Sequence, residues 1–172
     1  MPSKQLFVLR HAKSSWEDPG LDDHERPLAP RGRRAVQLLA QHVRDTGIRP
    51  DLVLCSSSRR ALETLEDLAP GGEVVIEPEF YAASAAEITE RLRRVPEGVK
   101  SVMVIGHNPA LQTLVLRLVG GNVARSSGSY IADVQRKFPT GALATLSFDG
   151  AWSELTPGSA ELAAYVRPKS LH

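Results

Sequence analysis

The stretch QLFVLRHAKSS, residues 5–15, decides how the fold is interpreted. It opens with a short apolar run, Leu6 to Leu9, and passes at once into the polar residues Arg10 and His11. Such a run is typical of a strand that is buried on both faces, as in parallel sheets. Residues that follow such a strand lie at the carboxyl edge of the sheet, where open α/β sheets bind their ligands. The polar end of this stretch is therefore the first place to look for chemistry.

Three further apolar runs share this pattern, and helix signals lie between them. The runs are Asp51 to Cys55, Glu73 to Ile76 and Ser101 to Ile105. Apolar spacing together with Pro and Gly boundary residues predicts helices at Pro30 to Gly47, Ala61 to Leu68, Ile88 to Val95 and Pro109 to Gly120. This alternation predicts an α/β three-layer sandwich, with a mostly parallel central sheet and helices on both faces.

The last part of the chain has the pattern of antiparallel strands. Gly141 to Phe148 and Trp152 to Leu155 are separated by the turn residues Asp149-Gly150. We expect a late hairpin at an edge of the sheet.

Length and composition predict one compact domain over residues 1–172. Hydrophobic residues make up 42% and charged residues 24%, and 21 basic against 20 acidic residues give a net charge of +1. We therefore expect neither a nucleic acid nor a membrane as partner, and any anion site must be local. Cys55 is the only cysteine, which excludes an intramolecular disulfide, and no apolar run approaches the roughly 20 residues of a membrane span. These features favour a cytoplasmic protein.

Cationic side chains follow three of the predicted strands. Arg10 and His11 follow the first, Arg60 comes soon after the second, and His107 follows the fourth. Guanidinium groups match phosphate oxygens, and a neutral imidazole can attack phosphorus and carry the phosphoryl group. A second histidine, kept protonated beside the anion, would stabilise the charge that spreads over the phosphoryl oxygens. The pattern predicts phosphoryl chemistry without a metal or another cofactor.

Other chemistries fit the sequence poorly. Arg60 follows Cys55 after four residues, one fewer than in the loop of tyrosine phosphatases, so we expect a buried thiol. Phosphate-loop, zinc-ligand and serine-hydrolase spacings are absent from the sequence. The remaining histidines, His24, His42 and His172, are expected at the surface.

The short motifs together resemble a known family. Leu9-Arg10-His11-Ala12 is similar to the Arg-His-Gly signature of the histidine phosphatase superfamily, Ser56 with Arg60 to Thr64 resembles its second arginine motif, and Gly106-His107 resembles its second histidine motif. Arg-His-Ala-Lys-Ser-Ser-Trp, with Asp23 to Leu28 soon after, resembles the SixA-type phosphohistidine phosphatase branch of this phosphoglycerate mutase-like superfamily.

The resemblance implies roles for four residues. His11 would be the nucleophile that becomes phosphorylated, while Arg10, Arg60 and His107 would hold the phosphoryl oxygens, and Arg59 would be a neighbour only. Ala12 stands where the superfamily usually has glycine, and alanine at this position fits the SixA branch. Further contacts to the phosphate or substrate are expected from three more residues, Lys13, Arg26 and Asn108.

The leaving group decides between substrates. Larger relatives use a glutamate as proton donor to an alcohol; Glu79 is the candidate here, and Glu87 is a weaker one. Imidazole leaves more easily than an alkoxide, which favours a phosphohistidine-containing protein, such as a phosphotransfer domain, as substrate and partner. The alternatives are a phosphatase of small phosphate monoesters with the same mechanism and a non-catalytic module that binds phosphoproteins.

Overall fold

The computed structural model describes residues 3–121 and 128–171. The prediction for His172 lies outside these residues. No helix in the described part of the chain is long and apolar enough to cross a membrane.

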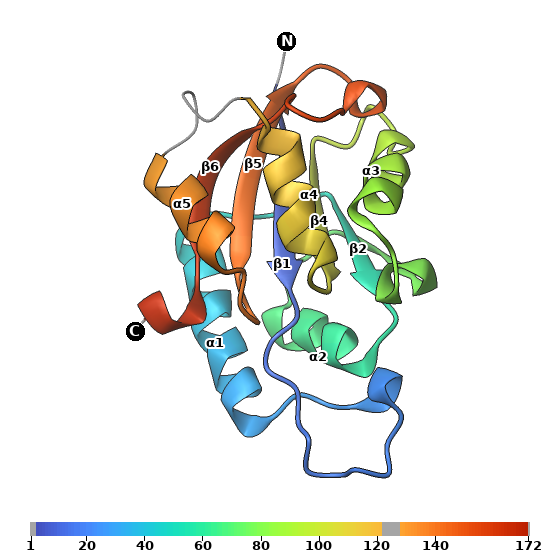
Figure 1. Cartoon of the computed structure of the whole chain (residues 1–172), viewed down its shortest axis with the longest axis vertical. Helices are drawn as coiled ribbons and strands as arrows, with labels where there is room; N and C mark the ends of the chain where they lie inside the picture. Colours follow the sequence, from blue (N-terminus) through green and yellow to red (C-terminus); the bar gives the residue numbers. More distant parts are fainter. Residues whose placement is uncertain (1–2, 122–127, 172) are drawn as a thin grey trace.

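A six-stranded mixed sheet forms the centre of the molecule (Figure 1). Its strands are β1 (Ser3–Arg10), β2 (Leu52–Ser56), β3 (Glu73–Glu77), β4 (Ser101–Gly106), β5 (Leu143–Asp149) and β6 (Glu161–Val166). The strand order is β3-β2-β4-β1-β5-β6, and the first four of these strands run parallel. β5 is antiparallel to β1, and β6 is antiparallel to β5. The predicted mostly parallel sheet is confirmed.

Helices cover both faces of this sheet, which confirms the three layers. They are α1 (Pro30–Asp45), α2 (Arg59–Leu68), α3 (Ala85–Arg93), α4 (Ala110–Val119) and α5 (Gly128–Arg136). α1 and α2 pack on one face, and α3, α4 and α5 pack on the other. Short 3-10 turns, η1 (Asp23–Glu25), η2 (Pro78–Tyr81), η4 (Trp152–Glu154) and η5 (Pro168–Ser170), complete the structure.

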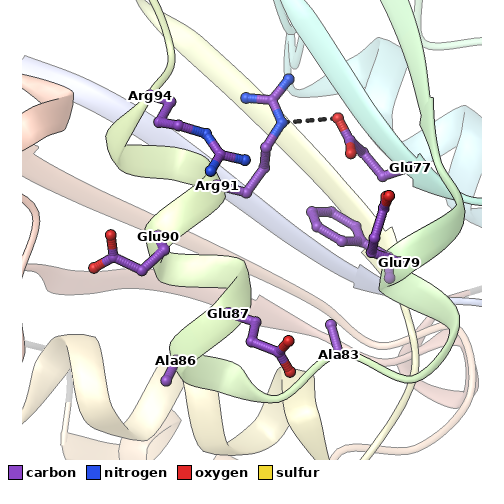
Figure 2. Close-up of a pocket in the computed structure, with 9 residues that line it drawn as sticks. Glu77, Glu79, Ala83, Ala86, Glu87, Glu90, Arg91 and Arg94 are labelled. Carbon is purple, nitrogen blue, oxygen red and sulfur yellow. Dashed lines mark hydrogen bonds and ion pairs between the residues drawn. The ribbon is translucent and has the colours of Figure 1, made fainter.

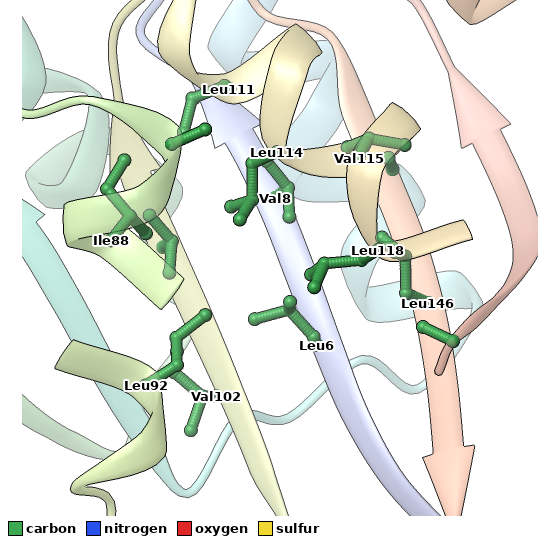
Figure 3. Close-up of a cluster of buried hydrophobic side chains, with 14 of the residues drawn as sticks. Leu6, Val8, Ile88, Leu92, Val102, Leu111, Leu114, Val115, Leu118 and Leu146 are labelled. Carbon is green, nitrogen blue, oxygen red and sulfur yellow. The ribbon is translucent and has the colours of Figure 1, made fainter. Parts of the chain in front are cut away.

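The alternation of side chains along β1 shows why both faces of the sheet are buried. Leu6 and Val8 contribute to the core beneath α3 and α4 (Figure 3), whereas Phe7 and Leu9 contribute to the core beneath α1 and α2. All four are at most 2% exposed. Because successive residues of a strand point to opposite faces, a continuous apolar run is required here.

Two details of the sequence prediction are wrong. Trp152 to Leu155 is not the second strand of the hairpin; it contains the turn η4, and the strand that pairs with β5 at the sheet edge is β6. The Trp152 side chain is fully buried and donates its indole N–H to the carbonyl of Val99, so this segment is held by burial rather than by strand pairing. β3 is also not buried on both faces, because it is an edge strand, with Val74 and Ile76 exposed.

Candidate active site

The carboxyl ends of β1, β2 and β4 meet at one end of the sheet and border a cavity of about 380 Å³, which we call the site cavity. Figure 1 shows β1 and β2 pointing towards this end, with the loop that follows β1 beyond them. The side chains that line the cavity are those of Arg10, His11, Lys13, Ser14, Trp16, Asp23, Arg26, Arg60, Tyr81, His107, Asn108 and Thr140. The structure thus brings together both histidines and both arginines of the predicted site.

His11 is the most enclosed imidazole of the site cavity. The residue is 5% exposed, and its Nδ1 lies 2.7 Å from the carbonyl oxygen of Ala12. A carbonyl only accepts hydrogen bonds, so Nδ1 carries the proton and Nε2 keeps its lone pair. That lone pair accepts the Nε–H of Arg60 at 3.4 Å. Burial, followed by the nearby charges of His107 and the two arginines, lowers the pKa of His11 to about 3, so the ring is neutral at pH 7.

The two arginines present their donors to the site cavity in different ways. Arg60 is 7% exposed and uses Nη1 and Nη2 to bind the backbone carbonyl and the carboxylate of Asp23, at 2.7 and 2.9 Å. Arg10 donates from Nη1 to the carbonyl of Phe138, but its buried Nε has no hydrogen-bond partner in the described part of the chain. A buried donor without an acceptor is costly. Arg10 also lines the site cavity, so its positive charge is close to any anion that binds there.

His107 is held by two serines, one at the end of β2 and one just after it. Its Nε2 lies 2.8 Å from the hydroxyl oxygen of Ser56 and 3.3 Å from that of Ser58, and its ring centroid is 5.1 Å from that of His11. Burial, followed by the charge of Arg60, lowers the pKa of His107 to about 4. The ring is therefore neutral near pH 7 in this arrangement, whereas the sequence analysis expects it to be protonated beside an anion.

The loop between β1 and α1 places a carboxylate in the site cavity that the sequence analysis did not assign. Asp23 accepts hydrogen bonds from Tyr81 at 2.5 Å, from Arg60 at 2.9 Å and from Arg26 at 3.2 Å. These contacts, the bond from Tyr81 first, lower the pKa of Asp23 to about 2. Asp23 is therefore ionised at neutral pH. The only local signal is its position at the start of the Asp23 to Leu28 segment.

Arg26 is a buried part of the same loop. It is 6% exposed, its Nη1 donates to the carbonyl of Ser15, and its guanidinium carbon lies 3.4 Å from the centroid of the Trp16 ring. The indole itself is 71% exposed at the rim of the cavity. Stacking of a guanidinium on an aromatic face stabilises both groups, so Trp16 and Arg26 fix one wall of the site cavity.

Tyr81 is a further residue that lines the site cavity and for which the sequence predicted no role. Its ring meets those of His107 and His24 edge-on, with centroid separations of 5.5 and 4.8 Å. His24, which we expected at the surface, is half-buried, and its Nε2 lies 2.9 Å from the Ser57 hydroxyl oxygen. It therefore supports the rim of the cavity next to Tyr81.

Glu79, the predicted proton donor, lies elsewhere. The structure places its side chain in a separate depression between η2 and α3, together with Glu77, Glu87 and Arg91 (Figure 2). Arg91 pairs there with Glu77 at 2.7 Å. Glu87 caps the first turn of α3 through Ser84. Neither Glu79 nor Glu87, the two candidate proton donors, lines the site cavity.

The other predicted contacts lie at its border. Asn108 lines the cavity, but its amide donates to the carbonyl of Phe138 and its Oδ1 accepts the backbone N–H of Gln112, so it braces the wall. Lys13 is exposed, and its ammonium group has no partner within the described residues. Arg59 points away and pairs with Glu63, in agreement with the prediction that it is only a neighbour.

Close packing holds the turn after β1 in place. The N–H of Ala12 donates to the Thr64 hydroxyl, which in turn donates to the carbonyl of Arg60, so the nucleophile candidate and the second arginine share one brace. Gly32 of α1 lies directly against the carbonyl of Lys13, where a Cβ atom would come within 2.2 Å of the oxygen. Ala12 has no positive φ, so the turn does not require glycine there.

Cys55 behaves as the sequence predicts. The thiol is fully buried in β2, and burial raises its pKa to about 12. A thiol in this state is not a nucleophile at neutral pH.

Comparisons with known proteins agree with this site. The family model described as "Histidine phosphatase superfamily (branch 1)" matches residues 6–82. The solved structure of a putative phosphohistidine phosphatase SixA from Nakamurella multipartitia has 31% sequence identity and a TM-score of 0.87, and the match covers 98% of each chain. An uncharacterised protein of Mycobacterium tuberculosis is 34% identical over 94% of this chain and its own full length. The phosphohistidine phosphatase SixA of Escherichia coli is 26% identical over 84% of this chain and 86% of its own.

The chain therefore belongs to the histidine phosphatase superfamily, and within it to the SixA-type branch. The predicted phosphoglycerate mutase-like fold class is confirmed by the match to the structure from Nakamurella and by a match to the phosphoglycerate mutase of Plasmodium falciparum, which has a TM-score of 0.62 and 16% sequence identity and covers 95% of this chain and 91% of the other.

Proposed function

We propose that this chain is a metal-independent phosphatase that removes the phosphoryl group from a protein phosphohistidine, with His11 as the nucleophile. The observation that carries the proposal is the state of His11. Its buried ring is neutral at pH 7, its proton is held on Nδ1 by Ala12, and its Nε2 lone pair is available next to Arg60. Membership of the superfamily supports the same role for the histidine of this motif.

In the first step the Nε2 lone pair of His11 attacks phosphorus. The bond between phosphorus and the substrate imidazole breaks, and its electron pair stays with the leaving ring. When the other nitrogen of that ring carries a proton, the ring leaves as neutral imidazole and needs no acid from the protein. The Nδ1 proton of His11 stays on the ring and remains hydrogen-bonded to the Ala12 carbonyl, which stabilises the positive charge that develops on the phosphorylated ring.

In the second step a water oxygen attacks the phosphoryl group on His11. The phosphorus–Nε2 bond breaks, its electron pair returns to Nε2, and both protons of the water leave with the phosphate as H₂PO₄⁻ or pass from it to solvent. Arg10 and Arg60 stabilise the charge on the phosphoryl oxygens in both steps, because their charge persists at any physiological pH. A bound dianion would also raise the pKa of His107 and allow that ring to donate to it.

The carboxylates of the site support phosphohistidine over a phosphate ester. Asp23 is the only carboxylic acid among the described residues that line the site cavity, and with a pKa of about 2 it has no proton to give at neutral pH. An alkoxide leaving group needs such a proton donor, whereas imidazole does not. The absence of a protonated carboxylic acid among the described lining residues therefore favours a phosphoramidate over a phosphate ester.

The test is phosphate release from a phosphohistidine protein and from a small aryl phosphate in the presence of a metal chelator. We expect the wild type to act mainly on the phosphohistidine protein, and His11→Ala to lose at least about 10³-fold in rate. His42→Ala, a change to a half-buried histidine of α1 remote from the site cavity, serves as the matched control and keeps wild-type activity. A preference for the aryl phosphate would instead support the monoester phosphatase, and stoichiometric binding without phosphate release would support the binding module.

A further inference from the structure

A second cavity lies beside the site cavity and is lined by four cationic side chains. It measures about 330 Å³ and contains Lys13, Arg31, Arg167 and Lys169, and we call it the basic depression. Its remaining lining is formed by Ala35, Pro139, Thr140 and Pro168, so no acidic side chain lines it within the described residues. The whole chain has a net charge of only +1, which makes this a local concentration of positive charge.

None of the four cations is paired with another described residue. No ion pair or side-chain hydrogen bond joins Lys13, Arg31, Arg167 or Lys169 to another described residue, whereas Arg33, close by on α1, pairs with Glu63 and Asp67. The four come from three separate segments: the turn after β1, the first turn of α1, and the chain from the end of β6 into η5. Like charges gathered by folding repel one another unless an anion meets them. The positive end of the α1 dipole, next to Arg31, adds to the same field.

The basic depression and the site cavity share a wall. Lys13 and Thr140 line both of them. Pro168 packs against Gly141, and the Gly141 N–H donates to the carbonyls of Arg10 and His11 at 3.0 Å. Figure 1 shows η5, at the C-terminal end, lying beside α1 on this side of the molecule. A protein whose phosphoryl group is bound at His11 can therefore reach the basic depression with neighbouring side chains.

We propose that the basic depression binds surface carboxylates of the phosphohistidine protein that flank its phosphorylated histidine. This inference rests on the proposed function and adds the charge character of the partner. A second phosphate on a small substrate has the same charge, but the geometry favours a protein surface. Lys13, Arg31 and Lys169 are exposed and spread over an open depression with apolar neighbours, whereas the site cavity binds its anion through the buried donors of Arg10 and Arg60.

The test compares a triple variant with a matched control. Arg31→Gln, Arg167→Gln and Lys169→Gln together remove three charges from the basic depression and leave Lys13, a neighbour of the site, unchanged. The control, Arg34→Gln with Arg94→Gln and Lys100→Gln, removes three exposed charges outside it. The substrates are a phosphohistidine protein with carboxylates around its phosphorylated histidine, the same protein with those carboxylates changed to amides, and the free amino acid phosphohistidine.

We expect kcat/KM of the triple variant to fall about 10-fold on the acidic protein at low salt, mainly through KM, because each of the three ion pairs at this solvent-accessible surface contributes modestly. The difference from wild type shrinks as salt screens the charges. Activity on free phosphohistidine and on the amide-substituted protein stays at the wild-type level, and the control triple variant matches wild type on all three substrates.

Three outcomes overturn the inference. Equal activity of the triple variant and the control on the acidic protein shows that the basic depression does not contact the substrate. An equal loss on free phosphohistidine shows damage to the site cavity instead. Stronger inhibition by a small bisphosphate than by a monophosphate, lost in the triple variant while the acidic protein is unaffected, assigns the depression to small molecules. Failure of the proposed function is distinct, since wild type would then release no phosphate from any phosphohistidine substrate.

Discussion

The carboxylate of Asp23 lies 2.9 Å from Nη2 of Arg60, and the backbone carbonyl of Asp23 lies 2.7 Å from Nη1 of the same guanidinium. The bond from Arg60 Nε to His11 Nε2 occupies the third nitrogen of the group. The carboxylate of Asp23 thus holds the guanidinium of Arg60 against the ring of His11. An incoming phosphoryl group competes with that anion for the same donors, so Asp23 both positions Arg60 and opposes anion binding.

Asp23→Asn separates these two effects. Removing the negative charge should tighten the binding of inorganic phosphate by about fivefold, a modest figure because the Asp23 side chain is 49% exposed. The turnover number should fall about 10-fold, because Arg60 loses its anchor and its alignment with His11. Steady-state kinetics with inorganic phosphate as competitive inhibitor measures both. Asp22→Asn, at an exposed neighbour whose side chain caps nothing, is the control, and weaker phosphate binding by Asp23→Asn would contradict the competition.

Tyr81→Phe should change the titration of Asp23. The hydrogen bond from the Tyr81 hydroxyl is the largest cause of the low pKa of Asp23, so its loss should raise that pKa from about 2 towards the ordinary 3.8. The ring contacts with His107 and His24 remain in this variant. Titration of the carboxyl carbon of Asp23 by NMR, in wild type and variant, measures the shift. An unchanged titration would show that Arg60 and Arg26 alone keep the carboxylate ionised.

Much of the site could be predicted because it depends on strand ends. An apolar run locates β1, β2 and β4, and the parallel order of these strands brings Arg10, His11 and His107 to one edge without any knowledge of the loops. Arg60 follows β2 on the first turn of a helix, so its position is set by the same topology.

The parts that could not be predicted depend on loop paths. Asp23 reaches Arg60, 37 residues further along the chain, and no local pattern specifies such a contact. In the segment after β3, a shift of two residues separates a side chain that lines the site from one that does not. Glu79 and Tyr81 are two residues apart in the 3-10 turn η2, and with three residues per turn they face different directions. Tyr81 faces the site cavity, and Glu79 faces the neighbouring depression.

Glu79→Gln tests this placement. A catalytic acid contributes about 10²- to 10⁴-fold to the rate, whereas a glutamate outside the site cavity should change kcat by less than about twofold. We expect the small change on both the phosphohistidine protein and the aryl phosphate, and the same from Glu87→Gln as a control in the same depression. A large loss confined to the aryl phosphate would show that Glu79 moves into the site cavity and acts as its proton donor.

Gly32→Ala should disturb the site from the opposite side of the turn. The added Cβ would lie 2.2 Å from the Lys13 carbonyl oxygen, so the turn after β1 has to move. We expect a loss of about 1–3 kcal/mol in the free energy of unfolding, measured with urea, and a fall in kcat/KM because Lys13 is two residues from His11. Gly98→Ala, where nothing lies within 4 Å of an added Cβ, should have little effect on either. Equal stability of the two variants would mean that α1 shifts without cost.

The depressed histidine pKa values predict how stability depends on pH. In the unfolded chain His11 and His107 take up protons below about pH 6.5, whereas in the folded protein they do so only near pH 3 and 4. Between these values the unfolded state binds more protons, so the free energy of unfolding falls as the pH falls, by up to about 1.4 kcal/mol per pH unit for each histidine. Urea unfolding between about pH 7.5 and 4.5 measures this slope. His107→Gln should make the slope shallower, because it removes the contribution of one histidine. A wild type whose slope matches that of His107→Gln would place the pKa of His107 near its ordinary value and contradict the lowered pKa.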